Sequence, residues 1–295
     1  MKTKLTNIER RYLPWIYGFL APTLLMFAVF YLWPIIQVTI TSFTRWNGFA
    51  TPEFTGVQNY ARLFRTKSFL ISMKNLALWS VIAATIHTAF GILVALAFYK
   101  QPKGWKVVRA VFMVPNIISG AAWAMIYRFV FNNDFGLINS FIRKFAADFS
   151  VNWFFESPAA FWAITFTWLF YAVVISLVVF ADLMAIPQDL HEAAMIDGAS
   201  GWRITTAIDI PLCRFSIGTS VIMGLTSRIS MYEAIALTSR GGPGDDTMGL
   251  SLILVKNITD HNYGLANATA VVMMILGLGI LYAANKIFKM SEPAA

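Results

Sequence analysis

Five long stretches of this chain contain no Asp, Glu, Lys or Arg. They run from Tyr12 to Thr44, from Asn75 to Tyr99, from Ala110 to Tyr127, from Ser157 to Ala181 and from His261 to Asn285. A sixth stretch, from about Phe215 to Thr238, is apolar but carries Arg228 and Glu233. Because a helix needs about 20 mainly apolar residues to cross the hydrocarbon of a bilayer, these stretches predict an all-α, polytopic membrane protein with six transmembrane helices.

The composition supports a membrane location. Of the 295 residues, 58% are hydrophobic and only 13% are charged, which is too apolar for a soluble domain of this size. The formal net charge of +8 raises the question of a nucleic-acid partner, but Lys and Arg are scattered around the apolar stretches and form no basic stripe. We therefore expect membrane lipid around the chain and no nucleic acid bound to it.

Basic residues near the first apolar stretch predict its orientation. Four of them precede it, namely Lys2, Lys4, Arg10 and Arg11, whereas Arg45 stands alone beyond its other end. Because Lys and Arg concentrate on the cytoplasmic side of membrane helices, we expect the N-terminus in the cytoplasm. Six spans return the C-terminus to the same side. Over the whole chain Lys and Arg are divided almost equally between the two sides, so the external segments are unusually basic.

A polar segment after the fourth apolar stretch has its own helix signals. Pro187 suits the start of a helix, and Gly198 is a stop signal. Asp189 and Glu192 are expected to place negative charge in the first turn. The segment thus predicts a short helix of about two to three turns, with Pro211 preventing the next helix from starting early. Such a helix indicates a docking element; the alternative is an ordinary connecting loop.

The residues of this segment stand at the spacing of the EAA motif: Glu192-Ala193-Ala194, Gly198, Ile208 and Ile210-Pro211. The chain thereby resembles the membrane subunit, or permease, of bacterial ATP-binding-cassette (ABC) importers, with Ile210 in place of the usual leucine. The turn Gly241-Gly242-Pro243 is similar to a signature of carbohydrate permeases of the maltose and glycerol-phosphate type. The resemblance implies a type I importer fold, in which a cytoplasmic coupling helix fits a cleft in the ATPase subunit. The coupling residues would be Glu192, Ala193, Ala194, Asp197 and Gly198.

The resemblance also implies a domain plan and a set of partners. Residues 1–14 would form a cytoplasmic N-terminal arm, residues 15–290 the transmembrane domain with its coupling loop at 184–211, and residues 291–295 a tail. The expected partners, at the bacterial inner membrane, are a second homologous permease, two ABC ATPase subunits and an extracytoplasmic solute-binding protein. No Gly-x-x-x-x-Gly-Lys-[Ser/Thr] motif occurs in the chain, so ATP and Mg²⁺ are expected on the ATPase subunits. The chain itself is expected to hold no cofactor or metal and to catalyse no reaction.

Arg228 is the strongest candidate for a substrate contact. An ionisable side chain inside a membrane helix costs roughly a few kcal/mol unless it faces a cavity or a partner. On one helix Gly224, Arg228 and Met231 would share a face, because they are spaced i, i+4 and i+7. The alternative is a structural role, in which Arg228 pairs inside the bundle with Glu233 or with a residue of a partner subunit.

Resemblance to maltose-type permeases adds the other candidate positions. Aligned through the EAA and Gly-Gly-Pro motifs, the sugar contacts of that family fall on Tyr171, Val174, Gly224, Arg228 and Met231. The residue types differ, so only the positions carry over. Arg228 favours a ligand with carboxylates, because a guanidinium binds a carboxylate through two parallel hydrogen bonds. We therefore expect an acidic oligosaccharide, such as an oligouronide. Tyr171 and nearby Trp168 are candidates for stacking on sugar rings, and packing against helices or lipid is the alternative.

The alternative function is a secondary transporter or a channel that works without ATPase subunits. A membrane-bound enzyme would need a reactive polar cluster, which the sequence does not show. His87, Asn116 and Trp123 are weaker candidates for the substrate path, and a lone histidine in a membrane span is more often hydrogen-bonded within the bundle.

Overall fold

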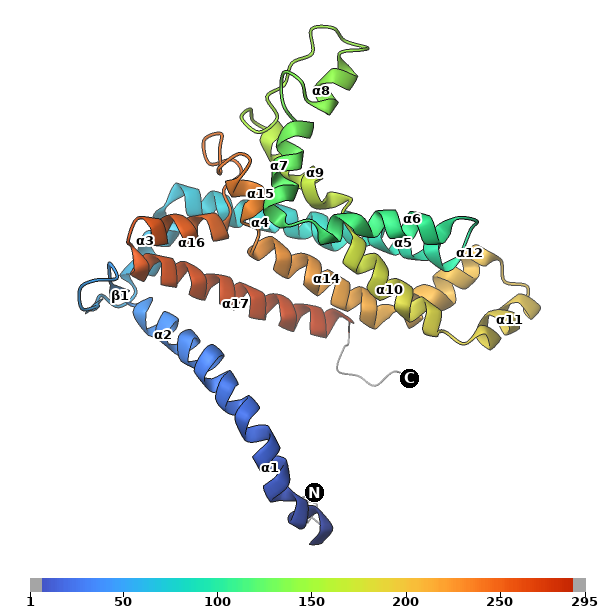
Figure 1. Ribbon diagram of the computed structural model, residues 1–295, viewed down its shortest axis with the longest axis horizontal. Coiled ribbons are helices and arrows are strands. Elements are labelled where there is room, and N and C mark those ends of the chain that lie inside the picture. The colour runs from blue at the N-terminus through green and yellow to red at the C-terminus, as the bar shows by residue number, and fades with distance from the viewer. Residues whose placement is uncertain (1–6, 289–295) are drawn as a thin grey trace.

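The computed structural model describes residues 7–288, and this part of the chain is mostly helical, with two short strands (Figure 1). The prediction of an all-α membrane protein is therefore confirmed. Residues 1–6 of the expected N-terminal arm and the tail expected at 291–295 lie outside the described residues. The remainder of the arm, from Asn7, is the beginning of the first helix, α1.

Between residues 7 and 288, four helical segments are long and apolar enough to cross a membrane. The first, Tyr12–Thr41, is formed by α1 (Asn7–Phe27), a π-helical turn (Ala28–Leu32) and α2 (Trp33–Thr41). The second, Lys67–Tyr99, joins α4 (Lys67–Ile82), a π-helical turn (Ala83–His87) and α5 (Thr88–Tyr99). The third, Ala159–Ala185, contains α9 (Ala159–Leu169) and α10 (Val173–Ala185), and the fourth is α17 (Tyr263–Phe288).

Two further segments are pairs of helices joined at a bend. The first pair is α6 (Trp105–Met113), extended by a 3₁₀ turn (Val114–Ile117), and α7 (Gly120–Val130), which meet at 105°. The second pair is the segment Gly201–Leu212 and α14 (Arg214–Ile229), which meet at 68°. The expected six spans are reached when each pair counts as one span.

Pro211 does not delay the start of the next helix, so that expectation was wrong. α12 (Gly201–Ile204) continues through a π-helical turn (Thr205–Asp209) into α13 (Ile210–Leu212), which contains Pro211. A π-helical turn offsets the ladder of backbone hydrogen bonds by one residue, which accommodates the N–H that proline lacks. The chain changes direction at Cys213 instead, just before α14.

Short elements cover the ends of the long helices. The strands β1 (Thr44–Arg45) and β2 (Glu53–Phe54) form an antiparallel hairpin, which is followed by α3 (Gln58–Arg65). α8 (Leu137–Ile142) lies in the part that projects from the bundle beyond α7, and α11 (Gln188–Ile196) lies at one end of the molecule (Figure 1). α15 (Glu233–Ala236) and α16 (Leu250–Thr259) stand on either side of the Gly-Gly-Pro turn.

The larger hydrophobic cluster of the bundle includes Trp79 of α4, which is 1% exposed. Its ring stacks on Phe161 of α9 with centroids 5.2 Å apart, and its indole N–H donates to the hydroxyl of Thr165 at 3.0 Å. α5 and α10 approach closely, because a Cβ on Gly91 would lie only 2.4 Å from a methyl carbon of Ile175. A small residue at the contact is the usual means by which membrane helices pack backbone to backbone.

The first membrane-crossing segment leaves the bundle (Figure 1). Its most apolar part has no buried residue. Its C-terminal end joins the bundle, where Asn267 of α17 donates to the hydroxyl of Thr41 at 2.7 Å. The apolar surface of α1 and α2 is therefore available to lipid or to a second membrane subunit.

Gly264, at the start of α17, is expected to tolerate no side chain, because a Cβ there would lie 1.9 Å from the carbonyl oxygen of Thr44. Gly264→Ala should displace β1 and destabilise the chain by about 1–3 kcal/mol, seen as a lower melting temperature of the purified chain in detergent. Gly277→Ala is the matched control in the same helix, since nothing lies within 4 Å of a Cβ at that position. Equal melting temperatures for the two variants would contradict this close packing.

Candidate functional site

The short helix predicted in the EAA segment is present as α11, and it has nine residues. Pro187 is its N-cap residue, and Asp189 lies in its first turn, where a negative charge favours the helix dipole. Glu192 lies in the second turn, so its predicted place in the first turn was wrong. The local structure of the segment is otherwise as the sequence predicted.

Gly198 closes α11 with a φ of +78°, a left-handed conformation that favours glycine. Its N–H donates to the carbonyl oxygen of Met195 at 3.0 Å, and the N–H of Ala199 donates to that of Ala194 at 2.9 Å. Met195 is 57% and Ile196 is 86% exposed. The last turn of α11 therefore presents apolar side chains away from the chain.

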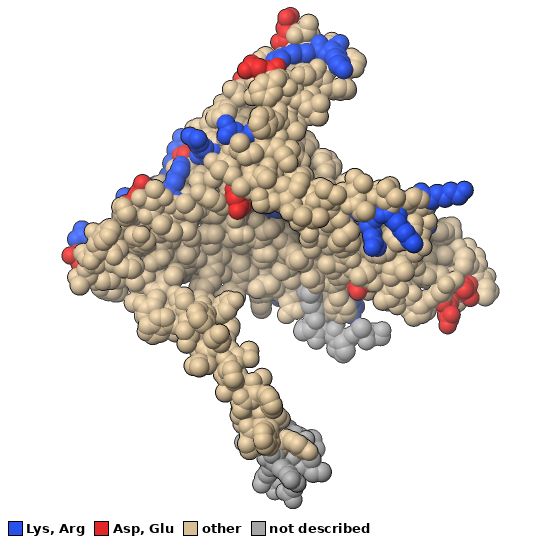
Figure 2. All heavy atoms as spheres, viewed as in Figure 1, with Lys and Arg blue, Asp and Glu red and all other residues tan. Residues whose placement is uncertain are grey.

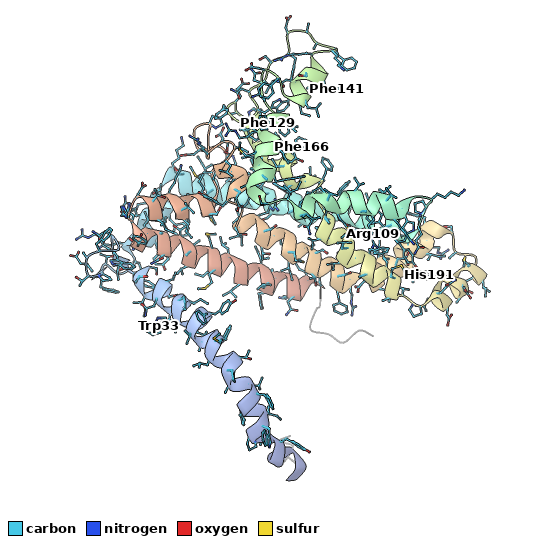
Figure 3. All side chains as sticks on the ribbon, viewed as in Figure 1. Trp33, Arg109, Phe129, Phe141, Phe166 and His191 are labelled. Carbon is cyan, nitrogen blue, oxygen red and sulfur yellow. The ribbon has the colours of Figure 1, made fainter. Side chains whose placement is uncertain are left out.

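A polar pair ties α11 to the rest of the molecule. Nε2 of His191 lies 2.7 Å from Oδ1 of Asp209, in the π-helical turn before α13. Asp209 is 3% exposed, and His191 lies where α11 meets the bundle (Figure 3). Because an ionised carboxylate only accepts hydrogen bonds, Nε2–H of His191 is the donor. The helix α11 is thus joined directly to the bent segment that leads into α14.

Basic residues gather near α11 on the neighbouring elements. The α5–α6 connection and the start of α6 carry Lys100, Lys103, Lys106 and Arg109. Basic atoms stand out there in Figure 2, whereas acidic atoms lie over α11. The guanidinium of Arg109 packs over the rings of Trp105 and Phe180, 5.2 and 5.5 Å from their centroids (Figure 3). At this end of the molecule a basic cluster on α6 and the connection before it thus lies beside the acidic surface of α11.

A cavity of about 220 Å³ lies against α10 and α14. Its lining consists of His87, Tyr171, Ala172, Val174, Ile175, Met223, Gly224, Ser227 and Arg228. Four of the five predicted substrate positions are therefore brought together, namely Tyr171, Val174, Gly224 and Arg228. Tyr171 enters the cavity from the break between α9 and α10. Sequence reasoning missed Ser227, although its i+3 spacing from Gly224 places it on the same face of α14.

Met231 does not line this cavity, and the argument that it shares a helix face with Gly224 and Arg228 was wrong. α14 ends at Ile229, and Met231 lies in the short connection before α15. Its carbonyl oxygen accepts a hydrogen bond from Ser251 at 2.5 Å, and its sulfur lies 3.8 Å from Nη1 of Arg228. Met231 therefore packs against Arg228 from outside the cavity.

Arg228 forms no ion pair with a carboxylate in the part of the chain that the structure describes. Its Nε and Nη2 lie 3.3 and 3.0 Å from the hydroxyl of Ser227, and its guanidinium lies 4.0 Å from the ring centroid of Trp168. Glu233 lies beside the start of α7, since a Cβ on Gly120 would be 3.2 Å from its Oε2. Pairing of Arg228 with Glu233 was therefore the wrong alternative. The guanidinium of Arg228 instead contacts the hydroxyl of Ser227 and the face of the Trp168 ring.

Aromatic and amide groups hold Tyr171 in place. Its hydroxyl donates to Oδ1 of Asn116 at 2.8 Å, and its ring lies 5.2 Å from that of Trp123. His87 is hydrogen-bonded within the bundle, with Nδ1 2.8 Å from the carbonyl oxygen of Leu169. Two of the weaker candidates, Asn116 and Trp123, thus support the wall of the cavity without lining it.

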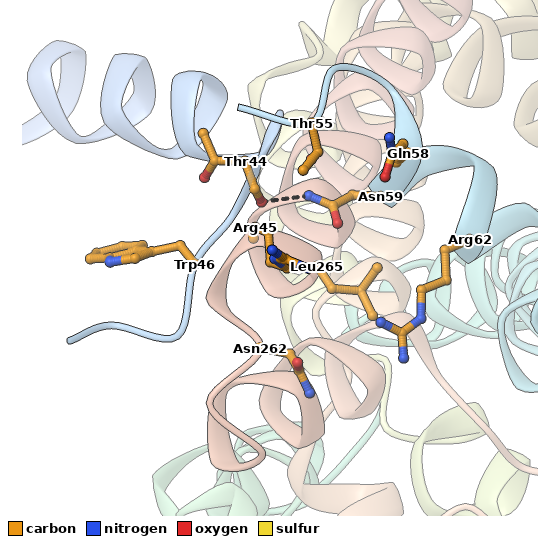
Figure 4. Close-up of a pocket in the computed structure, with 10 residues that line it drawn as sticks. Thr44, Arg45, Trp46, Thr55, Gln58, Asn59, Arg62, Asn262 and Leu265 are labelled. Atoms are coloured by element: carbon orange, nitrogen blue, oxygen red, sulfur yellow. Dashed lines mark hydrogen bonds between the residues drawn. The ribbon is translucent and has the colours of Figure 1, made fainter. Parts of the chain in front are cut away.

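A second hollow, of about 290 Å³, lies at the opposite end of the molecule from α11, between β1, α3 and the start of α17 (Figures 1 and 4). Its lining includes Arg45, Trp46, Gln58, Asn59, Arg62 and Asn262. We call it the α3 hollow. None of these residues was predicted as a site residue, because they come from segments far apart in the sequence that meet only in the fold.

No family model matches this chain, but curated proteins match along nearly its whole length. The trehalose/maltose transport system permease protein MalF of Thermococcus litoralis is 30% identical over 268 residues, which cover 89% of this chain and 89% of that protein. The multiple sugar-binding transport system permease protein MsmF of Streptococcus mutans is 28% identical over 271 residues, covering 90% and 92%.

Solved structures match as well. A chain of a bacterial ABC transporter involved in the import of the acidic polysaccharide alginate has a TM-score of 0.80 and 22% identity, covering 96% of this chain and 97% of that one. This likeness confirms the fold of an ABC importer permease. The sequence identity and the EAA and Gly-Gly-Pro motifs agree with it. The chain belongs to the family of sugar ABC transporter permeases, multi-pass membrane subunits that carry out transport and catalyse no reaction.

Proposed function

We propose that this chain forms one half of the translocation path for an oligosaccharide that carries carboxylates, such as an oligouronide. The observation that carries the proposal is Arg228, which lines the cavity and has no carboxylate partner among the described residues. An ionisable group at membrane depth costs roughly a few kcal/mol. A carboxylate offsets that cost through two parallel charge-assisted hydrogen bonds, whereas a neutral sugar supplies no opposite charge.

The other lining residues suit a sugar. Tyr171 offers an aromatic face, and Val174 adds an apolar contact. Gly224 leaves room, because a Cβ there would meet no atom closer than 3.8 Å. The cavity of about 220 Å³ is smaller than the roughly 300–1,000 Å³ of ordinary ligand pockets, so a second permease supplies the other half of the path. The alginate transporter with the similar permease fold imports an acidic polysaccharide, which supports the proposed substrate class.

Transport is driven, in this proposal, through α11. The residues Glu192, Ala193, Ala194, Asp197 and Gly198 contact an ATPase subunit, which binds the ATP and Mg²⁺. The exposed apolar last turn of α11 supports such a contact. Motion then passes through His191 and Asp209 to the bent segment before α14, which carries Arg228.

The proposed orientation has both termini in the cytoplasm and a solute-binding protein on the external side. The end of α17 lies toward the α11 end of the molecule, which supports a cytoplasmic C-terminus (Figure 1). The transmembrane domain would span residues 15–290.

The test is the ATPase activity of the complete transporter, reconstituted in proteoliposomes with its solute-binding protein. We expect trigalacturonate to stimulate ATP hydrolysis and to be taken up, and we expect maltotriose to do neither. Stimulation by maltotriose alone would overturn the acidic substrate. Uptake by the two permeases in the absence of the ATPase subunits would overturn the importer mechanism in favour of a secondary transporter or channel.

A further inference from the structure

The guanidinium of Arg228 contacts a residue of another membrane-crossing segment. Two of its contacts, Ser227 and Met231, belong to the same stretch of chain as Arg228 itself. The hydroxyl of Ser227 is also bound to its own helix, since it donates to the carbonyl oxygen of Gly224 at 2.8 Å. Trp168, near the end of α9, is the contact from a different segment, with its ring centroid 4.0 Å from the guanidinium. It is therefore the contact that sets the place of the guanidinium relative to α9 and α10.

The ring of Trp168 is itself fixed by its neighbours. It is 5% exposed and belongs to the larger hydrophobic cluster. The ring of His87 packs against it edge to face, with centroids 5.6 Å apart and an angle of 84° between the planes. Nδ1–H of His87 donates to the carbonyl oxygen of Leu169 at 2.8 Å, because a carbonyl only accepts. Trp168 thus presents a fixed aromatic face to Arg228.

Hydrogen bonding does not account for a tryptophan at this position. The indole N–H of Trp168 is buried and has no hydrogen-bond partner within residues 7–288, and a buried donor without an acceptor costs free energy. The buried Trp79, by comparison, donates to the hydroxyl of Thr165. What tryptophan does offer here is its π face, which attracts a cation more strongly than the face of any other aromatic side chain.

Trp168 was a candidate for stacking on sugar rings, but it is not among the residues that line the cavity, and Arg228 covers one face of its ring. We infer that Trp168 is a positioning residue. It holds the guanidinium of Arg228 at the cavity for a carboxylate of the substrate, and it does not contact the substrate itself. The inference rests on the proposed function for the role of Arg228 as the group that binds the carboxylate.

The test is a double-mutant cycle on the uptake of trigalacturonate by the complete transporter in proteoliposomes. Trp168→Phe should reduce uptake about threefold and Trp168→Leu about tenfold, because phenylalanine keeps a weaker π face and leucine has none. In the Arg228→Asn background, each should change uptake less than about twofold, since the contact is already lost.

The matched control is Trp79→Phe, a change of the same size in the same hydrophobic cluster, at a ring that stacks on Phe161. Its fractional effect on uptake should be the same with and without Arg228. Melting temperatures check the fold: Trp168→Phe should lower the melting temperature less than Trp79→Phe, which also loses the hydrogen bond to Thr165.

A second measurement needs no substrate. Phenylglyoxal reacts with guanidinium groups, and mass spectrometry of the digested chain gives the rate of labelling at Arg228. Without the indole face over which it packs, Arg228 should react about threefold faster or more in Trp168→Leu, and at the unchanged rate in Trp79→Phe.

Two outcomes would overturn the positioning role. They are an equal fractional loss of uptake from Trp168→Leu with and without Arg228, and an unchanged labelling rate of Arg228 in Trp168→Leu. Failure of the proposed transport function appears separately, as unchanged uptake of trigalacturonate by Arg228→Asn. In that case the labelling rate still decides whether Trp168 holds Arg228.

Discussion

Replacing Arg228 by Asn is expected to reduce the uptake of trigalacturonate about tenfold to a hundredfold. An amide in this place still forms hydrogen bonds, but it lacks the charge and the two parallel donors that match a carboxylate. Hydrogen bonds to charged groups contribute about 1.5–3 kcal/mol, which sets the size of the loss. Uptake into proteoliposomes that contain the complete transporter, at a fixed ATP concentration, measures it.

Two further variants separate the charge from the structure. Arg228→Lys keeps the charge but loses the flat group that lies over Trp168, so we expect an intermediate loss of uptake. Arg214→Asn removes a charge from the opposite end of α14, where the guanidinium lies 4.7 Å from the ring centroid of Phe215; uptake should change less than about twofold. Unchanged uptake by Arg228→Asn would refute the acidic substrate and leave the family assignment standing.

The membrane spans could be predicted because they depend on a property of each segment alone. An apolar, charge-free stretch crosses a bilayer whatever it packs against. The ends of the spans were harder to predict. The second span begins at Lys67 rather than at Asn75, because its helix extends beyond the apolar stretch and includes Lys74. The direction of a helix after a break was not predictable, since the bend at Cys213 is set by packing between segments.

The cavity against α10 and α14 shows the same division between what the sequence could and could not predict. Tyr171, Val174, Gly224 and Arg228 were correctly grouped by alignment through two motifs, without knowledge of the helix ends. Met231 was placed on the wrong surface because no glycine or proline marks the end of α14 after Arg228. A tertiary hydrogen bond from Ser251 to the carbonyl oxygen of Met231 accompanies that end, and periodicity carries no information about such a contact.

The contact between His191 and Asp209 could not be predicted from the sequence either, because it too is a tertiary contact. The two residues are 18 positions apart, on separate helical elements. The EAA spacing marks a helix and a turn, but it does not say which side chains join them. Only the path of α12 and the π-helical turn brings Asp209 back to α11.

That pair carries the second large effect that we expect. His191→Ala should lower the number of sugars transported per ATP hydrolysed about tenfold, because it leaves the side chain of Asp209 buried without its hydrogen-bond partner, at a cost of about 1–3 kcal/mol. The π-helical turn must then rearrange so that the side chain of Asp209 reaches water. A movement of α11 is then no longer transmitted to α14. ATP hydrolysis should continue, since the exposed last turn of α11 is unchanged. The ratio of sugar uptake to phosphate release measures the effect.

A second substitution distinguishes this link from simple damage to the loop. Adding Asp209→Asn to His191→Ala removes the buried charge, so the double variant should recover part of the transport ratio, as expected for two residues in one interaction. The matched control is Asp189→Asn, an exposed acid in the first turn of α11, which should change the ratio less than about twofold. If the double variant recovers nothing, or if Asp189→Asn is equally damaging, the side-chain pair is not the link, and motion must pass from α11 to α14 through the backbone after Gly198.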